Sequence, residues 1–168
     1  MKATISVVFV ILLGALAACG DEDSGPPKVK PPPPATLVTA SGMQTGGMRN
    51  YCWREGEKGL CVDAIGWMLP EEPILAQAGQ PITLQLQVEP TELSLLAWAL
   101  EDGNVVPDTV DGFFAWRPEA EPILREHPPA QSSFQFTPSL PPGQYVIELG
   151  VSAAPGSVGY DFLLELVP

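Results

Sequence analysis

The sequence predicts an all-β domain, an antiparallel β-sandwich with seven to nine short strands and little helix. Apolar and polar residues alternate along several short segments, most clearly over 82–88 and 160–166. Turns rich in glycine and proline separate these segments, and the 168 residues include 20 Pro and 16 Gly. Many short strands with turns between them are typical of a sandwich, with a closed barrel as the alternative.

The segment 1–18 has the layout of a secretory signal peptide. Lys2 supplies a short positive region, an apolar run follows over 3–16, and small residues precede Cys19. Because the apolar run is shorter than the roughly 20 residues that span a bilayer, a transmembrane anchor is the weaker alternative. A cleaved signal without lipid is a second alternative. Leu16-Ala17-Ala18-Cys19 resembles the bacterial lipobox, in which the cysteine becomes the first mature residue and carries acyl chains such as palmitate.

This resemblance implies a lipoprotein anchored through Cys19 in the cell membrane or outer membrane, on the extracytoplasmic side. The segment 19–34 is acidic and then Pro-rich, with too few apolar side chains to form a core. We therefore expect a disordered tether that ends in a stiff polyproline spacer, followed by a sandwich domain over 35–168. The formal net charge of −12 disfavours a nucleic-acid partner, since phosphates would be repelled.

Acylation of Cys19 leaves Cys52 and Cys61 as the remaining cysteines. An exported chain meets oxidising conditions, so we expect a disulfide that joins the two strands of a hairpin over 51–63. One of Tyr51 and Trp53 is expected to cover the core and the other to face outward. We expect no metal or other cofactor, because two cysteines with eight residues between them and no nearby histidine do not form a zinc site.

The hairpin segment also carries a family resemblance. Tyr51-Cys52-Trp53 and Gly59-Leu60-Cys61-Val62-Asp63 resemble a motif of small uncharacterised bacterial lipoproteins, in which Tyr-Cys-Trp and Gly-x-Cys-x-Asp bracket a turn. The resemblance covers about 15 residues of the chain. It implies an extracytoplasmic disulfide and brings no activity with it.

The remaining elements follow in chain order from local patterns. We expect a first edge strand over 35–40, a loop over 41–50, a helical turn over 71–78, strands over 82–88 and 93–100 with the second central in its sheet, a turn over 101–104, a short strand over 113–116, an irregular connection over 117–130, and strands over 132–136, 146–151 and 160–166. The segment Pro141-Pro142-Gly143-Gln144-Tyr145 resembles the tyrosine corner of immunoglobulin-like sandwiches. That resemblance implies an immunoglobulin-like fold in which the Tyr145 hydroxyl bonds to the backbone a few residues upstream.

The sequence favours no catalytic residue. His127 is the only histidine, it is followed by two prolines, and neighbouring Ser132 and Ser133 are not arranged as a nucleophile and its base. Asp102, Asn104, Asp108 and Asp111 resemble an oxygen-rich calcium loop but do not have the EF-hand spacing, which favours a solvated acidic loop and leaves calcium as the alternative. We therefore expect a protein that is not an enzyme.

Aromatic residues offer the other candidate site. Trp53, Trp67 and Trp116 are candidates for a surface that binds a glycan or an envelope protein, although core packing is the favoured alternative for such large apolar side chains. The predicted function is a membrane-anchored, non-catalytic binding module. The alternatives are a structural or assembly subunit of a cell-envelope complex that uses a sheet edge, and a module that resembles a protease inhibitor.

Overall fold

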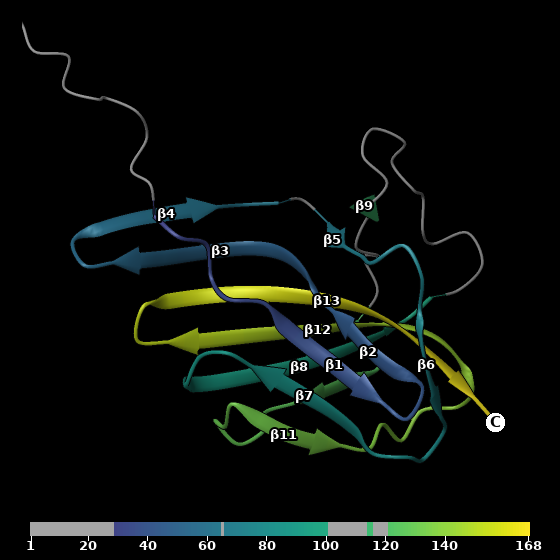
Figure 1. The fold of residues 1–168 in the computed structure, drawn as a ribbon. Helices are drawn as coiled ribbons and strands as arrows, with labels where there is room; N and C mark the ends of the chain where they lie inside the picture. The colour runs from purple at the N-terminus through teal and green to yellow at the C-terminus, as the bar shows by residue number, and fades with distance from the viewer. Residues whose placement is uncertain (1–28, 65, 101–113, 116–120) are drawn as a thin grey trace, which may run out of the picture.

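The computed structural model describes residues 29–64, 66–100, 114–115 and 121–168. Within these ranges the chain forms strands and no helix, arranged in two packed sheets and a two-stranded ribbon (Figure 1). The predicted antiparallel β-sandwich is confirmed, and the barrel alternative is wrong because the two sheets remain separate. The described ranges contain thirteen strands rather than seven to nine.

The two sheets differ in width. The smaller sheet has the order β11-β7-β1-β2, with bounds Ser133–Phe136, Ile82–Leu86, Ala35–Thr39 and Gly42–Thr45. The larger, seven-stranded sheet has the order β10-β8-β12-β13-β3-β4, with bounds Leu124–Glu126, Pro90–Ala99, Gly143–Ala153, Gly156–Val167, Gly47–Glu55 and Lys58–Val62. Its seventh strand, β6 (Ile74–Gln77), runs parallel to β13. The ribbon pairs β5 (Trp67–Met68) with β9 (Phe114–Ala115).

The core lies between the facing sides of the two sheets. Because side chains alternate along a strand, every second residue of each strand points into this space. Burying a Leu, Ile or Phe side chain stabilises the fold by about 1.5–3 kcal/mol, so this alternation supplies most of the driving force. The fully buried large side chains of this core are Leu37, Ile82, Leu84, Leu93, Leu95, Ile147, Leu149, Tyr160, Phe162, Leu164 and Leu166.

The strand β13 changes its neighbour halfway along, and Gln44 fills the gap. β3 pairs with β13 as far as Asp161, and β6 pairs with it from Leu164 onward. Between these points the Gln44 side chain donates to the Leu163 carbonyl at 3.2 Å and accepts from the Leu163 amide at 3.1 Å. The Gln44 amide therefore replaces a peptide group of the missing strand neighbour.

Two predictions near the N-terminus are corrected by the structure. The segment 35–40 does contain a strand, β1, but β1 is not an edge because β7 and β2 lie on either side of it. The segment 41–50 is not a loop, since it forms β2 and the first part of β3. The glycines in this segment favour a loop, but β1 pairs with β2 and β13 pairs with β3, and these cross-strand hydrogen bonds hold the segment as strands.

Two further predictions fail because tertiary pairing overrides local pattern. The expected helical turn over 71–78 is instead the strand β6, which is held in parallel register along the last residues of β13. The expected irregular connection over 117–130 contains β10, which pairs with β8. The expected strands over 82–88, 93–100 and 132–136 are confirmed as β7, β8 and β11, and β8 is central between β10 and β12.

The C-terminal hairpin contains the predicted tyrosine corner. The Tyr145 hydroxyl donates to the Pro141 carbonyl at 2.7 Å, four residues upstream, at the start of β12. β12 and β13 then pair along their whole length, from Gly143 opposite Leu166 to Ala153 opposite Gly156. This long hairpin forms the middle of the seven-stranded sheet.

The described part of the Pro-rich segment lies against the domain. The side chains of Val29 and Pro32 are buried, and the Tyr160 hydroxyl donates to the Pro33 carbonyl. The Lys30 amide contacts the Glu55 carboxylate at 3.4 Å, at the tip of the β3–β4 hairpin. The described part of the chain therefore already packs on the domain upstream of β1, from Val29 onward.

Candidate functional site on the outer face of the seven-stranded sheet

The outer face of the seven-stranded sheet, which points away from the core, brings together polar side chains from several strands. Its residues lie in rows across the strands because the antiparallel register places them directly opposite one another. One row joins Glu148 to Asp161, and the next joins Ser94, Gly150 and Gly159. A third row begins at the Cys52–Cys61 pair.

The first row holds two buried carboxylates and a cation. Glu148 on β12 is 3% exposed, and its cross-strand neighbour Asp161 on β13 is 0% exposed. Like charges directly opposite one another destabilise a sheet. The Arg49 guanidinium offsets this repulsion, with Nη2 at 3.2 Å from Glu148 Oε2 and Nε at 3.4 Å from Asp161 Oδ1. We call these three residues the ion cluster.

The segment around β5 covers the ion cluster. Trp67 Nε1 donates to Glu148 Oε1 at 2.6 Å, and the Met68 amide donates to Asp161 Oδ2 at 2.8 Å. The indole of Trp67 is fully buried and packs edge-on against Trp98, with ring centroids 5.9 Å apart. A second apolar cluster forms here, on the opposite side of the sheet from the main core, from Trp67, Leu69, Trp98 and Val146.

A β-bulge places the arginine of this cluster. Tyr51 lies opposite Val158, and Met48 lies opposite Tyr160, so that Arg49 and Asn50 together face the single residue Gly159. A bulge of this kind bends the strand and redirects a side chain. A Cβ on Gly159 would lie 2.6 Å from Asn50 Oδ1 and 3.3 Å from Arg49 Nη2, so glycine at this position leaves room for both side chains.

A shallow hollow lies beside the ion cluster. Its floor is the cross-strand pair Gly150 and Gly159, and a Cβ on Gly150 would overlap the Ser94 hydroxyl. The hollow has a volume of about 260 Å³, and its wall offers hydroxyl, amide, carboxylate and guanidinium groups. Such a lining suits a ligand held by hydrogen bonds. The polar side chains that line it are Arg49, Asn50, Glu92, Ser94, Ser152 and Ser157.

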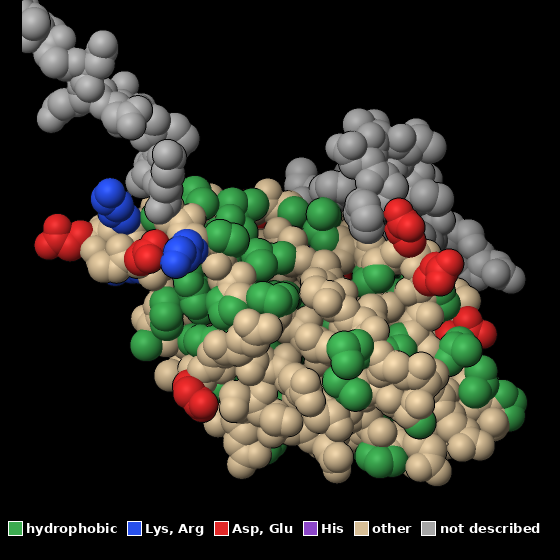
Figure 2. All heavy atoms as spheres, viewed as in Figure 1, with side chains coloured by type: hydrophobic (Ala, Val, Ile, Leu, Met, Phe, Trp, Pro, Cys, Tyr) green, Lys and Arg blue, Asp and Glu red, His purple; other side chains and the backbone are tan. Residues whose placement is uncertain are grey.

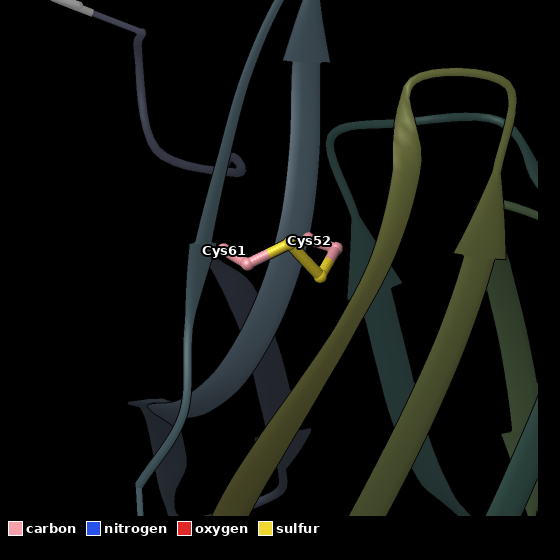
Figure 3. Close-up of a disulfide and its surroundings, with 2 residues drawn as sticks. All are labelled: Cys52 and Cys61. Carbon is pink, nitrogen blue, oxygen red and sulfur yellow. A yellow bond between two sulfur atoms is a disulfide. The ribbon is translucent and has the colours of Figure 1, made fainter.

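The predicted disulfide is present on the same face. Cys52 and Cys61 lie opposite each other in the β3–β4 hairpin, with Cα atoms 4.1 Å apart, and their sulfurs are bonded (Figure 3). Both residues are exposed. A second hollow of about 730 Å³ lies beside the disulfide and shares Ser152 and Ser157 with the first. The disulfide therefore borders the hollowed part of the outer face.

The prediction that Trp53 and Trp67 form a surface binding site is wrong. Trp53 is 7% exposed in the main core, and Trp67 is 0% exposed, so these two fill cores rather than form a binding surface. Tyr51 packs against the same core as Trp53, and the expectation that the two face opposite ways is wrong. Residues two apart on a strand share a face, and Cys52 between them points outward.

Several other predictions lie outside the described residues or remain untested. Cys19, Trp116 and the acidic segment 101–111 lie outside the described residues. His127 follows β10 and is exposed. Across the described ranges, no group of three or more His, Cys, Asp and Glu side chains is arranged to hold a metal ion. The same ranges contain no helix long and apolar enough to cross a membrane.

Two buried phenols keep their protons through a wide pH range. Burial raises the pKa of the Tyr160 phenol, and burial also raises the pKa of Tyr145. Both hydroxyls act as donors to backbone carbonyls, of Pro33 and Pro141 respectively. They therefore serve to hold the chain rather than to transfer protons.

Comparison with known proteins adds no assignment. No protein family matches the chain. No curated protein matches it with significant similarity.

Proposed function

We propose that the protein is a membrane-anchored extracytoplasmic lipoprotein whose sandwich is a non-catalytic binding module. The observation that carries this proposal is the Cys52–Cys61 disulfide in a chain that begins with a signal-like segment ending at Cys19. Disulfides persist in oxidising compartments, which is where such a signal would deliver the domain. The acyl chains at Cys19 would hold it there, since two or three chains give stable anchoring.

The hollow over Gly150 and Gly159 supports a binding role. It lies on an exposed sheet face, and a small substitution at either glycine would fill or distort it. Its described lining is mainly polar and includes neither a histidine that could act as the base for a serine nor a free thiol that could act as a nucleophile. We assign the ligand to polar, hydrogen-bonding molecules such as an envelope glycan or the polar surface of an envelope protein.

Lipidation is tested by changing the acylated residue. The Cys19→Ala variant should leave the detergent phase in a phase-separation assay and accumulate as an unprocessed precursor. Mass spectrometry of the wild-type protein should show an acylated Cys19 at the mature N-terminus. A mature N-terminus without acyl mass would overturn the anchor.

Binding is tested by blocking the hollow. Wild-type protein and the Ser152→Tyr and Ser157→Tyr variants are compared for retention of envelope polysaccharide and envelope proteins. Gln135→Tyr is the matched control, since Gln135 is an exposed strand residue on the smaller sheet. We expect the two hollow variants to lose a ligand that wild type and control retain. If wild type, both hollow variants and the control retain the same ligands equally, the hollow is not the binding site.

The absence of catalysis is tested at His127. The His127→Ala variant should keep the fold and every phenotype of the wild type, because this exposed residue belongs to no site in our account. A hydrolase activity that disappears in this variant would show that the protein is an enzyme.

A second candidate function is assembly through a sheet edge. β4 is the last strand of the seven-stranded sheet, and Val62 on it is 40% exposed. Such an edge can add a strand from a partner. Co-purification of envelope subunits that the Val62→Lys variant abolishes, with the hollow variants unaffected, would favour this function over the first.

A further inference from the structure

A hydrogen-bond donor and an acceptor meet over Gly159, in the floor of the hollow beside the ion cluster. The place that a Cβ would take on Gly159 is 2.6 Å from Asn50 Oδ1, an acceptor, and 3.3 Å from Arg49 Nη2, a donor. Asn50 is exposed, and the side chain of Arg49 is 19% exposed beside its ion pair with Glu148. A ligand atom above Gly159 would therefore lie next to both groups at once.

A hydroxyl is the ligand group that satisfies this pair most simply. It has one hydrogen to donate to Asn50 and lone pairs that accept from Arg49. An ammonium group only donates and an ionised carboxylate only accepts, so each would leave one of the two protein groups without a bond. A trans peptide group points its N–H and C=O in opposite directions and cannot serve both groups from one side. The pair therefore favours a hydroxyl.

A second contact point lies one strand away. Gly150 is the cross-strand neighbour of Gly159, and the Ser94 hydroxyl lies where a Cβ on Gly150 would be. Cβ positions of directly opposite residues are about 4.5–5.5 Å apart, so the two contact points are separated by a similar distance. A sugar ring carries hydroxyls at separations of this order. Because neither glycine has a side chain, such a ring can lie close to the sheet.

The charge around the hollow favours an uncharged ligand. Among the described residues that line it, Arg49 and Glu92 are the charged ones. Glu148 and Asp161 offset the charge of Arg49, so the guanidinium attracts an anion only weakly, and its position at the floor disfavours a cation. The chain has 20 Asp and Glu against 8 Lys and Arg, and Figure 2 shows acidic side chains toward the margins of the face on view. A polyanion would be repelled by this charge.

The size of the hollow suits part of a longer chain. Its volume of about 260 Å³ is below the roughly 300–1,000 Å³ of pockets that enclose a drug-sized ligand. The hollow of about 730 Å³ beside the disulfide shares Ser152 and Ser157 with it, and these two serines lie opposite each other on β12 and β13. A chain of sugar residues can therefore continue from the first hollow, across the two serines, into the second.

We propose that the hollow binds a neutral glycan chain, with one sugar hydroxyl bonded to Arg49 and Asn50 and a second bonded to Ser94. The proposal rests on the binding function proposed above for the same hollow and narrows its ligand to an uncharged polysaccharide. Ser152 and Ser157 contact the chain where it passes toward the disulfide.

The test uses the full-length protein in detergent and a panel of immobilised polysaccharides. Dextran, mannan, galactan and the neutral fraction of the envelope polysaccharide are the uncharged members, polygalacturonate is the anionic one and chitosan the cationic one. We expect retention on at least one uncharged member and on neither charged one. Retention should be the same at low and high salt, because salt screens only charged ligands. Longer fragments of the retained polysaccharide should compete better than its monosaccharide.

Matched variants test the individual contacts. Asn50→Ala and Ser94→Ala should each weaken retention about two- to tenfold, the range expected for the loss of one hydrogen bond. Gln135→Ala, on the smaller sheet, should bind as wild type does, and thermal unfolding shows whether each variant keeps its fold. Retention confined to the charged polysaccharides, retention of none, or equal retention by wild type and both hollow variants would overturn the proposal.

The Ser152→Tyr and Ser157→Tyr variants separate this proposal from the binding function on which it rests. An envelope protein that wild type retains and these variants lose, with no polysaccharide retained, would refute the glycan and leave the hollow as a binding site. A polysaccharide that wild type and both tyrosine variants retain equally would refute the hollow itself.

Discussion

The two faces of the seven-stranded sheet are built from the same strands but are stabilised in different ways. On β13, Tyr160 and Phe162 point into a continuous apolar core, while Asp161 between them points outward and is equally buried. The inner face is covered by a second sheet that alternates in the same manner. Among the described residues, the segment that carries Trp67 covers one part of the outer face, and another part forms the polar hollow.

This difference shows that burial on the outer face depends on specific polar contacts rather than on general apolar packing. Covering the carboxylates of Glu148 and Asp161 is costly without partners, because a buried charge loses its hydration. Arg49, Trp67 and the Met68 amide supply those partners. The inner face should therefore respond to changes in volume, and the outer face to the loss of a single partner.

The largest expected effect is on the inner face. Phe162→Ala should reduce the free energy of unfolding by about 3–5 kcal/mol, because it leaves a cavity at a fully buried position. The matched change Leu163→Ala, next along β13 and half-buried on the outer face, should cost about 1 kcal/mol. Urea unfolding of both variants measures the difference. Equal losses would contradict the assignment of the two faces.

Breaking the ion cluster should have the next largest effect. Arg49→Met keeps much of the side-chain volume but removes a cation that contacts two buried carboxylates, and a loss of about 3 kcal/mol is expected. Arg125→Met is the control, since its ion pair with Glu121 at 3.7 Å is exposed and should contribute about 0–1 kcal/mol. An Arg49→Met variant as stable as its control would show that the cluster contributes nothing.

The disulfide should contribute slightly less. Replacing Cys52 and Cys61 with serine removes a link that closes a short loop, with a sequence separation of 9. The chain-entropy description gives a loss of about 2–3 kcal/mol, provided that the hairpin is otherwise kept. Thermal unfolding of the double variant, compared with wild type with and without reductant, measures it. If reduced and oxidised wild-type protein unfold at the same temperature, the prediction is contradicted.

The smallest expected effect concerns Gln44, whose side chain bonds to the Leu163 backbone between the points where β3 and β6 pair with β13. Gln44→Ala removes both partners of the Leu163 backbone, and leaving such groups unsatisfied costs about 1–3 kcal/mol. Gln135→Ala, which removes an exposed side-chain bond to Thr83, should change stability by less than about 0.5 kcal/mol. Hydrogen exchange should also show faster exchange at the Leu163 amide in the Gln44 variant alone. An unchanged exchange rate at the Leu163 amide would show that the Gln44 side chain does not protect it.

The sequence predicts the inner face well. Period-two alternation identified β7 and β13, the apolar run over 93–100 identified the central strand β8, and a Pro-Gly-Gln-Tyr segment identified the tyrosine corner. The disulfide could be predicted because the expected acylation of Cys19 would leave Cys52 and Cys61 as a single pair. These features depend on residues close together in the chain or on a repeating pattern.

The outer face was not predicted, for physical reasons. Glu148 and Asp161 occupy positions where an alternating strand normally faces water, so nothing in the local pattern marks them as buried. Their cover comes from Trp67 and Met68, some 80 and 90 residues earlier, and their cation from a bulge at Arg49. The strand β6 could not be predicted because, within the described ranges, it pairs with the distant C-terminal end of β13. Long-range pairing of this kind leaves no local signal.

The central claim, that an exported and disulfide-linked sandwich is anchored through Cys19, is tested most directly by the intact mass of the protein extracted from membranes. We predict a chain that begins at Cys19, carries the mass of its acyl groups, and gains the mass of two hydrogens on reduction as the Cys52–Cys61 bond opens. A chain without acyl mass, or one whose mass does not change on reduction, would contradict the account.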